Sequence, residues 1–113
     1  MMTRLFSVLA LCVLATSALA DAKLQKSSPA AGAKVASPAH VTLYFSSALE
    51  PAFSGAMLLD SDGRNVSGAP VKVSGTEIVI TPGPLVPGVY HVAWHSAGHD
   101  TSRLEGEFRF TVK

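Results

Sequence analysis

The chain has 113 residues, with nine lysines and arginines against eight aspartates and glutamates, and a formal net charge of +1 at pH 7. This near balance gives no electrostatic case for binding to nucleic acid or to an anionic membrane surface. The single cysteine, Cys12, lies in the N-terminal leader described next, so we expect no disulfide in the mature domain.

Residues 1–20 have the pattern of a secretory signal peptide. Arg4 supplies the positive charge, the apolar run Leu5–Leu14 follows, and Ala18 and Ala20 form the small-residue pair of a cleavage site. The apolar run is shorter than the roughly 20 residues that a membrane-spanning helix needs. We therefore predict an exported, periplasmic protein that does not itself span the membrane.

The cleavage site sets the first residue of the mature chain. Cleavage after Ala20 gives a signal peptide over 1–20 and a single mature domain over 21–113, beginning at Asp21. A second small-residue pair, Ala20 and Ala22, allows the alternative start at Lys23.

The mature part predicts an all-β domain. In chain order, the expected strands are 23–27, 40–45, 56–60, 70–74, 77–81, 88–95 and 106–113. Between the fourth and fifth, S-G-T-E is a tight hairpin signal. Between the second and third, "SSALEPAF" allows one helical turn at most, because Pro51 interrupts it. Seven short strands joined by turns predict an immunoglobulin-like Greek-key β-sandwich or barrel.

Alternation identifies the expected core. In 106–113, Phe108 and Phe110 share one face with Val112, while charged and polar residues occupy the other face. In the absence of a disulfide, we expect the aromatic residues to form the core, namely Phe45, Trp94, Phe108 and Phe110.

Catalytic motifs are absent from the sequence. It contains no G-x-S-x-G, no phosphate-binding glycine loop and no H-E-x-x-H. Its glutamates fall in loops or at strand edges, where solvation explains them. We therefore predict a protein that is not an enzyme.

Metal binding is the stronger candidate, because the chain has four histidines: His40, His91, His95 and His99. Imidazole and carboxylate groups suit Cu(II), Zn(II) or Ni(II). His91 and His95 lie about 13 Å apart in an extended strand and cannot share one ion unless the strand bends. The segment "HSAGHD" can instead fold back and gather His95, His99 and Asp100. The alternative is that these are ordinary exposed polar residues.

Methionine content argues against a thioether-rich Cu(I) site. The chain after residue 20 contains one methionine, Met57, which the strand pattern assigns to packing. A soft Cu(I) site built from thioethers needs several of them.

Three stretches of the mature chain resemble the periplasmic copper-resistance protein C (CopC) family. They are "AKLQKSSPAAGAKV", "SSALEPAFSGAMLLDSDGRNV" and "GVYHVAWHSAGHDTSRLEGEFRFTVK", and together they cover most of 22–113. The resemblance implies an immunoglobulin-like β-barrel, a periplasmic location, a role in copper handling and delivery to an inner-membrane copper protein of the companion D type.

The resemblance also shows where this chain departs from the family. The family's Cu(II) site resembles a brace of an N-terminal histidine and an Asp-x-His pair that follows the tryptophan. Asp21 stands at the first histidine position, Asp100 on the aspartate, and Ser102 on the second histidine. The family's methionine-rich Cu(I) segment has no counterpart.

We therefore predict a periplasmic copper carrier or buffer in copper homeostasis or resistance. Its expected ligands are Asp21 and Asp100 by family position, with His99 and His95 as replacement donors. This oxygen-rich set favours Cu(II) over Cu(I) and predicts weaker Cu(II) binding than the family brace. The alternative is an immunoglobulin-like interaction module that has lost copper and binds a protein partner by strand addition.

Overall fold

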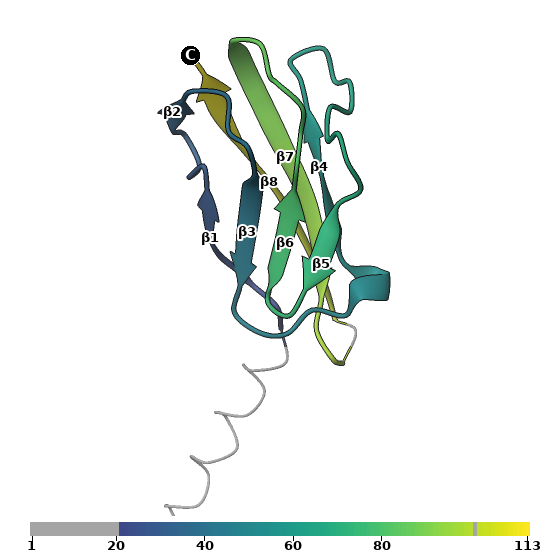
Figure 1. Cartoon of the computed structure of the whole chain (residues 1–113). Helices are drawn as coiled ribbons and strands as arrows, with labels where there is room; N and C mark the ends of the chain where they lie inside the picture. The colour runs from purple at the N-terminus through teal and green to yellow at the C-terminus, as the bar shows by residue number, and fades with distance from the viewer. Residues whose placement is uncertain (1–20, 101) are drawn as a thin grey trace, which may run out of the picture.

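The computed structural model describes residues 21–100 and 102–113; the predicted leader lies outside the described residues. Within the described part, the chain forms eight strands and one short 3₁₀ turn (Figure 1). In chain order these are β1 (Leu24–Ser28), β2 (Lys34–Val35), β3 (Val41–Phe45), η2 (Pro51–Phe53), β4 (Gly55–Leu59), β5 (Lys72–Ser74), β6 (Glu77–Ile80), β7 (Gly88–Ala97) and β8 (Arg103–Val112).

The strands form two four-stranded sheets. One has the order β1-β3-β6-β5 and the other β2-β8-β7-β4. All pairings are antiparallel except β2 with β8, which is parallel. The sheets face each other as a sandwich, with β4 and β5 along one side and β1 and β2 along the other (Figure 1). This confirms the predicted all-β sandwich.

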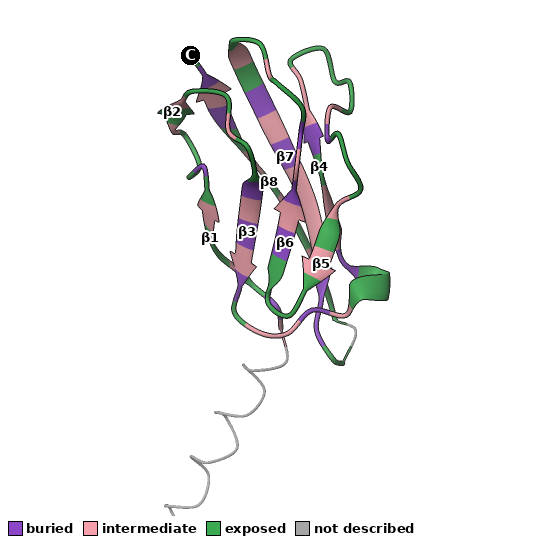
Figure 2. Ribbon diagram, viewed as in Figure 1, coloured by how far each residue is buried: buried purple, intermediate pink, exposed green. Residues whose placement is uncertain are grey.

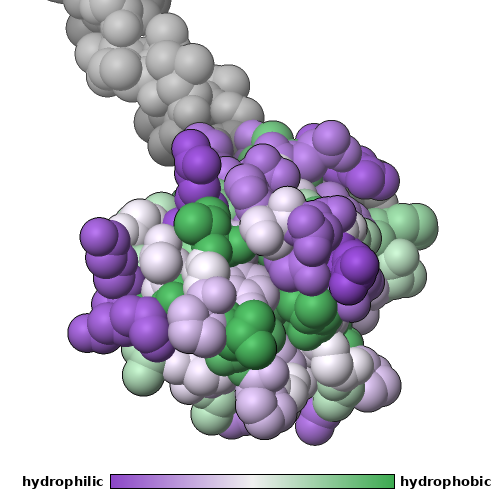
Figure 3. Space-filling model, turned by 90° about the horizontal axis from the view of Figure 1, so that it is seen from above, coloured by the Kyte–Doolittle hydropathy of each residue, from purple (hydrophilic) through white to green (hydrophobic). Residues whose placement is uncertain are grey.

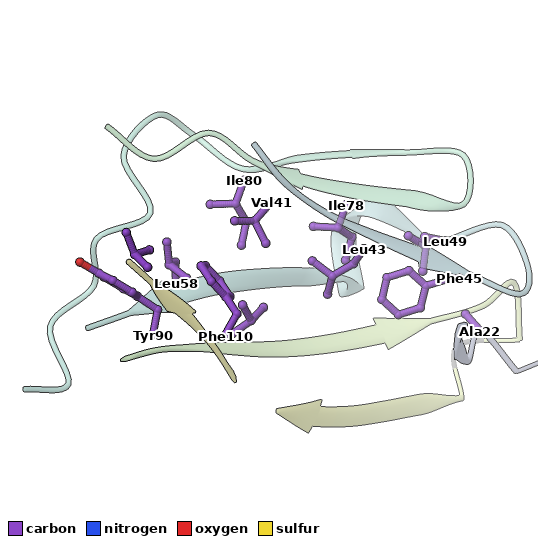
Figure 4. Close-up of a cluster of buried hydrophobic side chains, with 12 residues drawn as sticks. Ala22, Val41, Leu43, Phe45, Leu49, Leu58, Ile78, Ile80, Tyr90 and Phe110 are labelled. Atoms are coloured by element: carbon purple, nitrogen blue, oxygen red, sulfur yellow. The ribbon is translucent and has the colours of Figure 1, made fainter. Parts of the chain in front are cut away.

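The core lies between the sheets and follows from the alternation of the strands. In β3 the side chains alternate between buried and half-buried, and the same inward register recurs in β6 and β7 (Figure 2). Figure 4 shows the resulting cluster, which extends from Tyr90 and Phe110 at one end to Phe45, Leu49 and Ala22 at the other. Burial of these apolar side chains is the main stabilising contribution, at about 25 cal/mol per Å² removed from water.

The predicted aromatic core is confirmed, although two of its members sit at its margin. Phe45 and Phe110 are buried, whereas Trp94 and Phe108 are partly buried and pack against the cluster. The indole of Trp94 meets the ring of Phe45 edge-on, with centroids 5.4 Å apart. It also covers Gly106, where an added Cβ would lie 2.5 Å from an indole carbon. A glycine inside β8 is therefore required by the tryptophan on the neighbouring strand.

The observed elements differ from the expected ones mainly at their ends. All seven expected strands are present, and the two-residue β2 is added. The expected hairpin is confirmed, with Ser74 paired to Glu77. β7 extends to Ala97 and β8 begins at Arg103, so the segment between them is shorter than expected. Pro51 begins the 3₁₀ turn rather than interrupting it, because proline lacks only an N–H that has no partner at a helix start.

The two ends of the sandwich differ in character. One end carries the loop between β6 and β7, where Val86 is 73% exposed, and Figure 3 shows hydrophobic surface there among polar side chains. The other end carries the start of the described chain, the segment after β3 and the β7–β8 turn (Figure 1). The residues that the sequence singled out as family-position ligands, Asp21 and Asp100, belong to this second end.

Candidate metal site

The first described residues are held by serine hydroxyls. The carbonyl oxygen of Asp21 accepts hydrogen bonds from the Oγ atoms of Ser46, at 3.2 Å, and Ser47, at 3.1 Å. The backbone N–H of Lys23 donates to Ser46 Oγ at 2.9 Å, and the Lys23 carbonyl accepts from the Ser46 N–H at 2.8 Å. These bonds fix the backbone of the segment and leave the Asp21 side chain uninvolved in holding it there.

Ala22 anchors the same segment in the core. Its side chain is fully buried, and its carbonyl oxygen accepts a 2.6 Å hydrogen bond from Ser96 Oγ, which is also fully buried. Ser96 follows the inward register of Tyr90, Val92 and Trp94 in β7. A buried hydroxyl in an apolar register requires a partner, because leaving it unpaired costs about 1–3 kcal/mol. The partner here is the N-terminal segment itself.

The β7–β8 turn places Asp100 in solvent. Its Oδ1 accepts from the backbone N–H of Ser102 at 3.0 Å, and its Oδ2 accepts from Ser102 Oγ at 2.9 Å. The backbone hydrogen bond and then the side-chain hydrogen bond from Ser102 lower the pKa of Asp100. The carboxylate is therefore ionised at neutral pH, which is the form that binds a metal ion.

The histidines are distributed over the strand and the turn. His99 is exposed beside Asp100 in the turn. His95 remains inside β7, paired with Gly55 on one side and Glu105 on the other. His91 is also in β7, and its Nδ1 atom lies 3.9 Å from a carboxylate oxygen of Glu107. The predicted fold-back at "HSAGHD" is therefore delayed, because the strand continues through Ala97 before the chain turns.

This geometry does not assemble a complete coordination sphere from side chains alone. Among residues 21–100 and 102–113, no three or more histidine, cysteine, aspartate or glutamate side chains are close enough to hold one metal ion. The structure places Asp21 and Asp100 at one end of the sandwich and keeps His95 on β7. The four-residue ligand set remains a prediction.

The sequence reading missed the serines that hold the N-terminal segment. For Ser96 there was a signal, since it is a polar residue in the inward register of an otherwise apolar strand face. Ser46 and Ser47 had no comparable signal, because they lie in a polar segment where serine is unremarkable.

No helix in the described part of the chain is both long enough and apolar enough to cross a membrane.

Sequence comparisons point to one family. The CopC domain model matches residues 24–113. The copper resistance protein C of Pseudomonas syringae pv. tomato is 38% identical over 108 residues, covering 86% of each chain. Protein YobA of Escherichia coli strain K12 is 36% identical over 114 residues, covering 92% of each.

Structural comparisons agree. CopC from Methylosinus trichosporium OB3b superposes with a TM-score of 0.75 at 33% identity, covering 82% of this chain and 94% of that one. PcoC, a methionine-rich copper resistance protein from Escherichia coli, gives 0.74 at 35% identity, covering 83% and 100%. The matched segment includes both sheets and the β7–β8 turn, and the chain belongs to the CopC family.

Proposed function

We propose that this protein is an exported copper-binding protein that carries or buffers copper in resistance or homeostasis. Support comes from its family and from relatives that are named copper resistance protein C. The sequence contains no motif for catalysis, which supports a binding role rather than an enzymatic one. The signal-peptide pattern of residues 1–20 supports a periplasmic location.

The observation that carries the proposal is the serine-held N-terminal segment at the end where the Asp100 turn lies. Because Ser46, Ser47 and Ser96 fix the backbone, the terminal amine of a chain beginning at Asp21 has a defined position. That amine and the Asp21 carboxylate would act with Asp100 as a nitrogen- and oxygen-donating set. Such donors suit Cu(II) better than Cu(I).

The two histidines contribute differently to this proposal. His99 is adjacent to Asp100 in the turn and is the nearer replacement for the imidazole that Ser102 lacks. His95 is the more remote replacement, since it belongs to the strand and pairs with Gly55 and Glu105.

Burial of Ala22 supports cleavage after Ala20. A mature chain starting at Lys23 would lack a fully buried side chain and would leave the Ser96 hydroxyl without its acceptor. We therefore propose that the mature domain spans 21–113. Delivery to an inner-membrane copper protein of the companion D type is part of the same proposal and is supported by family resemblance.

Titration of the mature protein with Cu(II), followed by d–d absorption and electron spin resonance, tests the function. We expect one equivalent to bind more tightly than to a peptide with the same first residues, because the turn adds Asp100. Replacing Asp100→Asn should weaken binding about tenfold or more, and His99→Ala less, since an anionic donor and then an imidazole are removed.

The matched control is Asp62→Asn, an exposed aspartate in the turn after β4. It should leave Cu(II) affinity unchanged. Binding no tighter than that of the peptide would refute the site.

The alternative function is an interaction module that works by strand addition. The observation favouring it is that the described residues offer no group of three or more metal-binding side chains, while β5 is a sheet edge with exposed Lys72 and Ser74. An exposed edge can pair with an extended peptide through backbone hydrogen bonds. A mature start at Lys23, measured by mass spectrometry, together with absent Cu(II) binding, would favour this module.

A further inference from the structure

The side of the sandwich that carries β4 and β5 has a groove of about 750 Å³. β4 is the edge of one sheet and β5 is the edge of the other, and Figure 1 shows both strands along the same side of the molecule. The apolar part of the groove is lined by partly buried residues that pack against the core, namely Ala56, Val71, Val73 and Trp94. A ligand in the groove would therefore contact apolar surface that neither sheet covers.

The hydrogen bonds of β4 show where its edge is unpaired. The N–H of Leu58 donates to Ser67 Oγ at 2.9 Å, and the Leu58 carbonyl accepts from the N–H of Val66 at 2.8 Å. The backbone groups of Leu58 thus point away from β7. Because these directions alternate along an antiparallel strand, the N–H and C=O of Ala56 also point away from β7. Within the described part of the chain, neither of these two groups has a hydrogen-bond partner.

Two large apolar side chains beside this edge are exposed. Met57, which follows Ala56 directly, is 43% exposed, and Phe53 in η2 is 56% exposed. Phe53 lies between Pro51 and Ser54, which both line the groove. Aromatic residues and methionine are enriched in protein interfaces, and exposed apolar residues that gather in one place mark interaction sites. The surface around the edge therefore has the composition of a protein interface.

The charged residues of the groove carry a net negative charge. Arg103, Glu105 and Glu107 line it from β8, which gives one positive charge against two negative charges. Arg103 Nη2 lies 3.1 Å from Glu105, so the carboxylate of Glu107 is not offset by that arginine. A second copy of the chain would bring the same negative charge to a symmetric contact. The groove is therefore complementary to a basic segment rather than to itself.

We propose that the edge of β4 at Ala56 is a docking site for an extended, basic segment of a partner protein. One residue of the segment exchanges two backbone hydrogen bonds with the N–H and C=O of Ala56. Directly opposed residues share a face of the sheet, so the side chain of that residue points into the groove beside Val73 and is apolar. Its two neighbours point to the outer face, where a basic side chain meets Glu107.

This docking site goes beyond the proposed copper-binding function. It does not use Asp21 or Asp100, and it does not require that copper binding has been lost. It also differs from the β5 edge of the alternative function, because the unpaired groups that it uses belong to β4.

A capped peptide, Thr-Lys-Val-Lys-Thr, is the probe, and amide NMR of the isotope-labelled mature protein is the measurement. We expect the Ala56 amide to shift and to become protected from hydrogen exchange as the peptide is added. The same peptide with an N-methylated valine keeps the side chains but lacks the backbone donor, and it should bind about fivefold more weakly or less. An Ala56 amide that stays unmoved at the highest soluble peptide concentration would overturn the proposal. A shift at Val73 and Ser74 without one at Ala56 would place the peptide on β5 and would also overturn it.

Dilution of the protein alone tests a second copy as the occupant. The Ala56 amide should not depend on protein concentration. A shift that grows with concentration would show that two copies pair through this edge and would overturn the assignment to a basic partner.

Variants separate backbone pairing from general attraction. Ala56→Pro removes the outward N–H and no bond to β7, and edge strands tolerate proline in this orientation, so peptide affinity should fall about fivefold or more. Glu107→Gln keeps the backbone intact and should also weaken binding, more strongly at low salt. The matched control is Glu77→Gln, an exposed glutamate on β6 that does not line the groove. Equal weakening in the two glutamate variants would show non-specific attraction and would overturn the site.

Failure of this site and failure of the Cu(II) site can be told apart. Asp100→Asn should lower Cu(II) affinity and leave peptide affinity unchanged, whereas Glu107→Gln should do the reverse. Peptide binding that persists in Asp100→Asn supports the docking site even where Cu(II) does not bind. Peptide binding that disappears in that variant would overturn the proposal.

Discussion

The N-terminal segment 21–23 and the part of the β7–β8 turn that carries Asp100 and Ser102 belong to the same end of the sandwich but are held by different interactions. Ala22 is fully buried, and its segment takes hydrogen bonds from serines on β7 and after β3. The exposed Asp100 and Ser102 instead bond to each other. The core thus fixes the backbone of the N-terminal segment. The turn is held by hydrogen bonds between its own residues, so its side chains can change at little cost in stability.

The largest expected effect comes from restoring imidazoles to this scaffold. In the double variant Asp21→His with Ser102→His, we expect Cu(II) affinity to rise about 100-fold, at roughly tenfold for each imidazole. The resemblance to the family brace motivates this change, and competition titration measures it. If the segment is fixed by its backbone, the melting temperature of the apo-protein should stay within about 2 °C. An affinity equal to that of the parent would contradict the view that the scaffold is intact.

Removing the buried hydrogen bond that anchors the N-terminal segment should lower the stability of the domain. Ser96→Ala leaves the carbonyl of Ala22 without its donor in a buried position, and we expect the free energy of unfolding to fall by about 1–3 kcal/mol. Urea denaturation of the apo-protein measures this. Ser102→Ala, the matched control in the exposed turn, should stay within about 0.5 kcal/mol of the parent. Equal losses in the two variants would show that the turn is not independent of the core.

The smallest effect concerns the charge on Asp100. Ser102→Ala removes the hydroxyl donor but keeps the backbone N–H, so the pKa of Asp100 should rise part of the way to its ordinary value. Carboxyl carbon shifts in an NMR titration measure it. Because the folded pKa is lowered, the stability that this group contributes is present above its unfolded pKa and lost as pH falls through the folded pKa. The variant should therefore be slightly less stable than the parent above the unfolded pKa, and the difference should disappear in acid. An unchanged pKa of Asp100 would exclude the hydroxyl as a cause.

The fold was largely predictable because alternation leaves a clear trace in the sequence. Strands such as 106–113 show one apolar face, and burial of Phe110 and Val112 follows from it. The lengths of β7 and β8 were less predictable, because Ser96, Gly106 and the charged residues between them do not continue the alternation that is typical of a strand. They are held in the sheet by pairing with each other, for example Trp94 over Gly106 and Ser96 with Leu104.

The candidate site was predictable only as far as residue type. His95 and Asp100 were identified from their chemistry, but the length of β7 separates the strand histidine from the turn. Met57 was assigned to packing in the core or at its rim, and the strand register places it on the outer face of β4, where it is 43% exposed. One residue of register decides the face, and no short pattern around Met57 specifies it.

The contact of Trp94 with Gly106 and Phe45 has a spectroscopic consequence. The chain has one tryptophan, and its indole is held on one side by a strand backbone and on another by an aromatic edge. A chromophore fixed in such an asymmetric setting gives a near-ultraviolet circular dichroism band that disappears when side-chain packing is lost. The emission of the same indole gives a second measure of the packing around β7, to which it belongs.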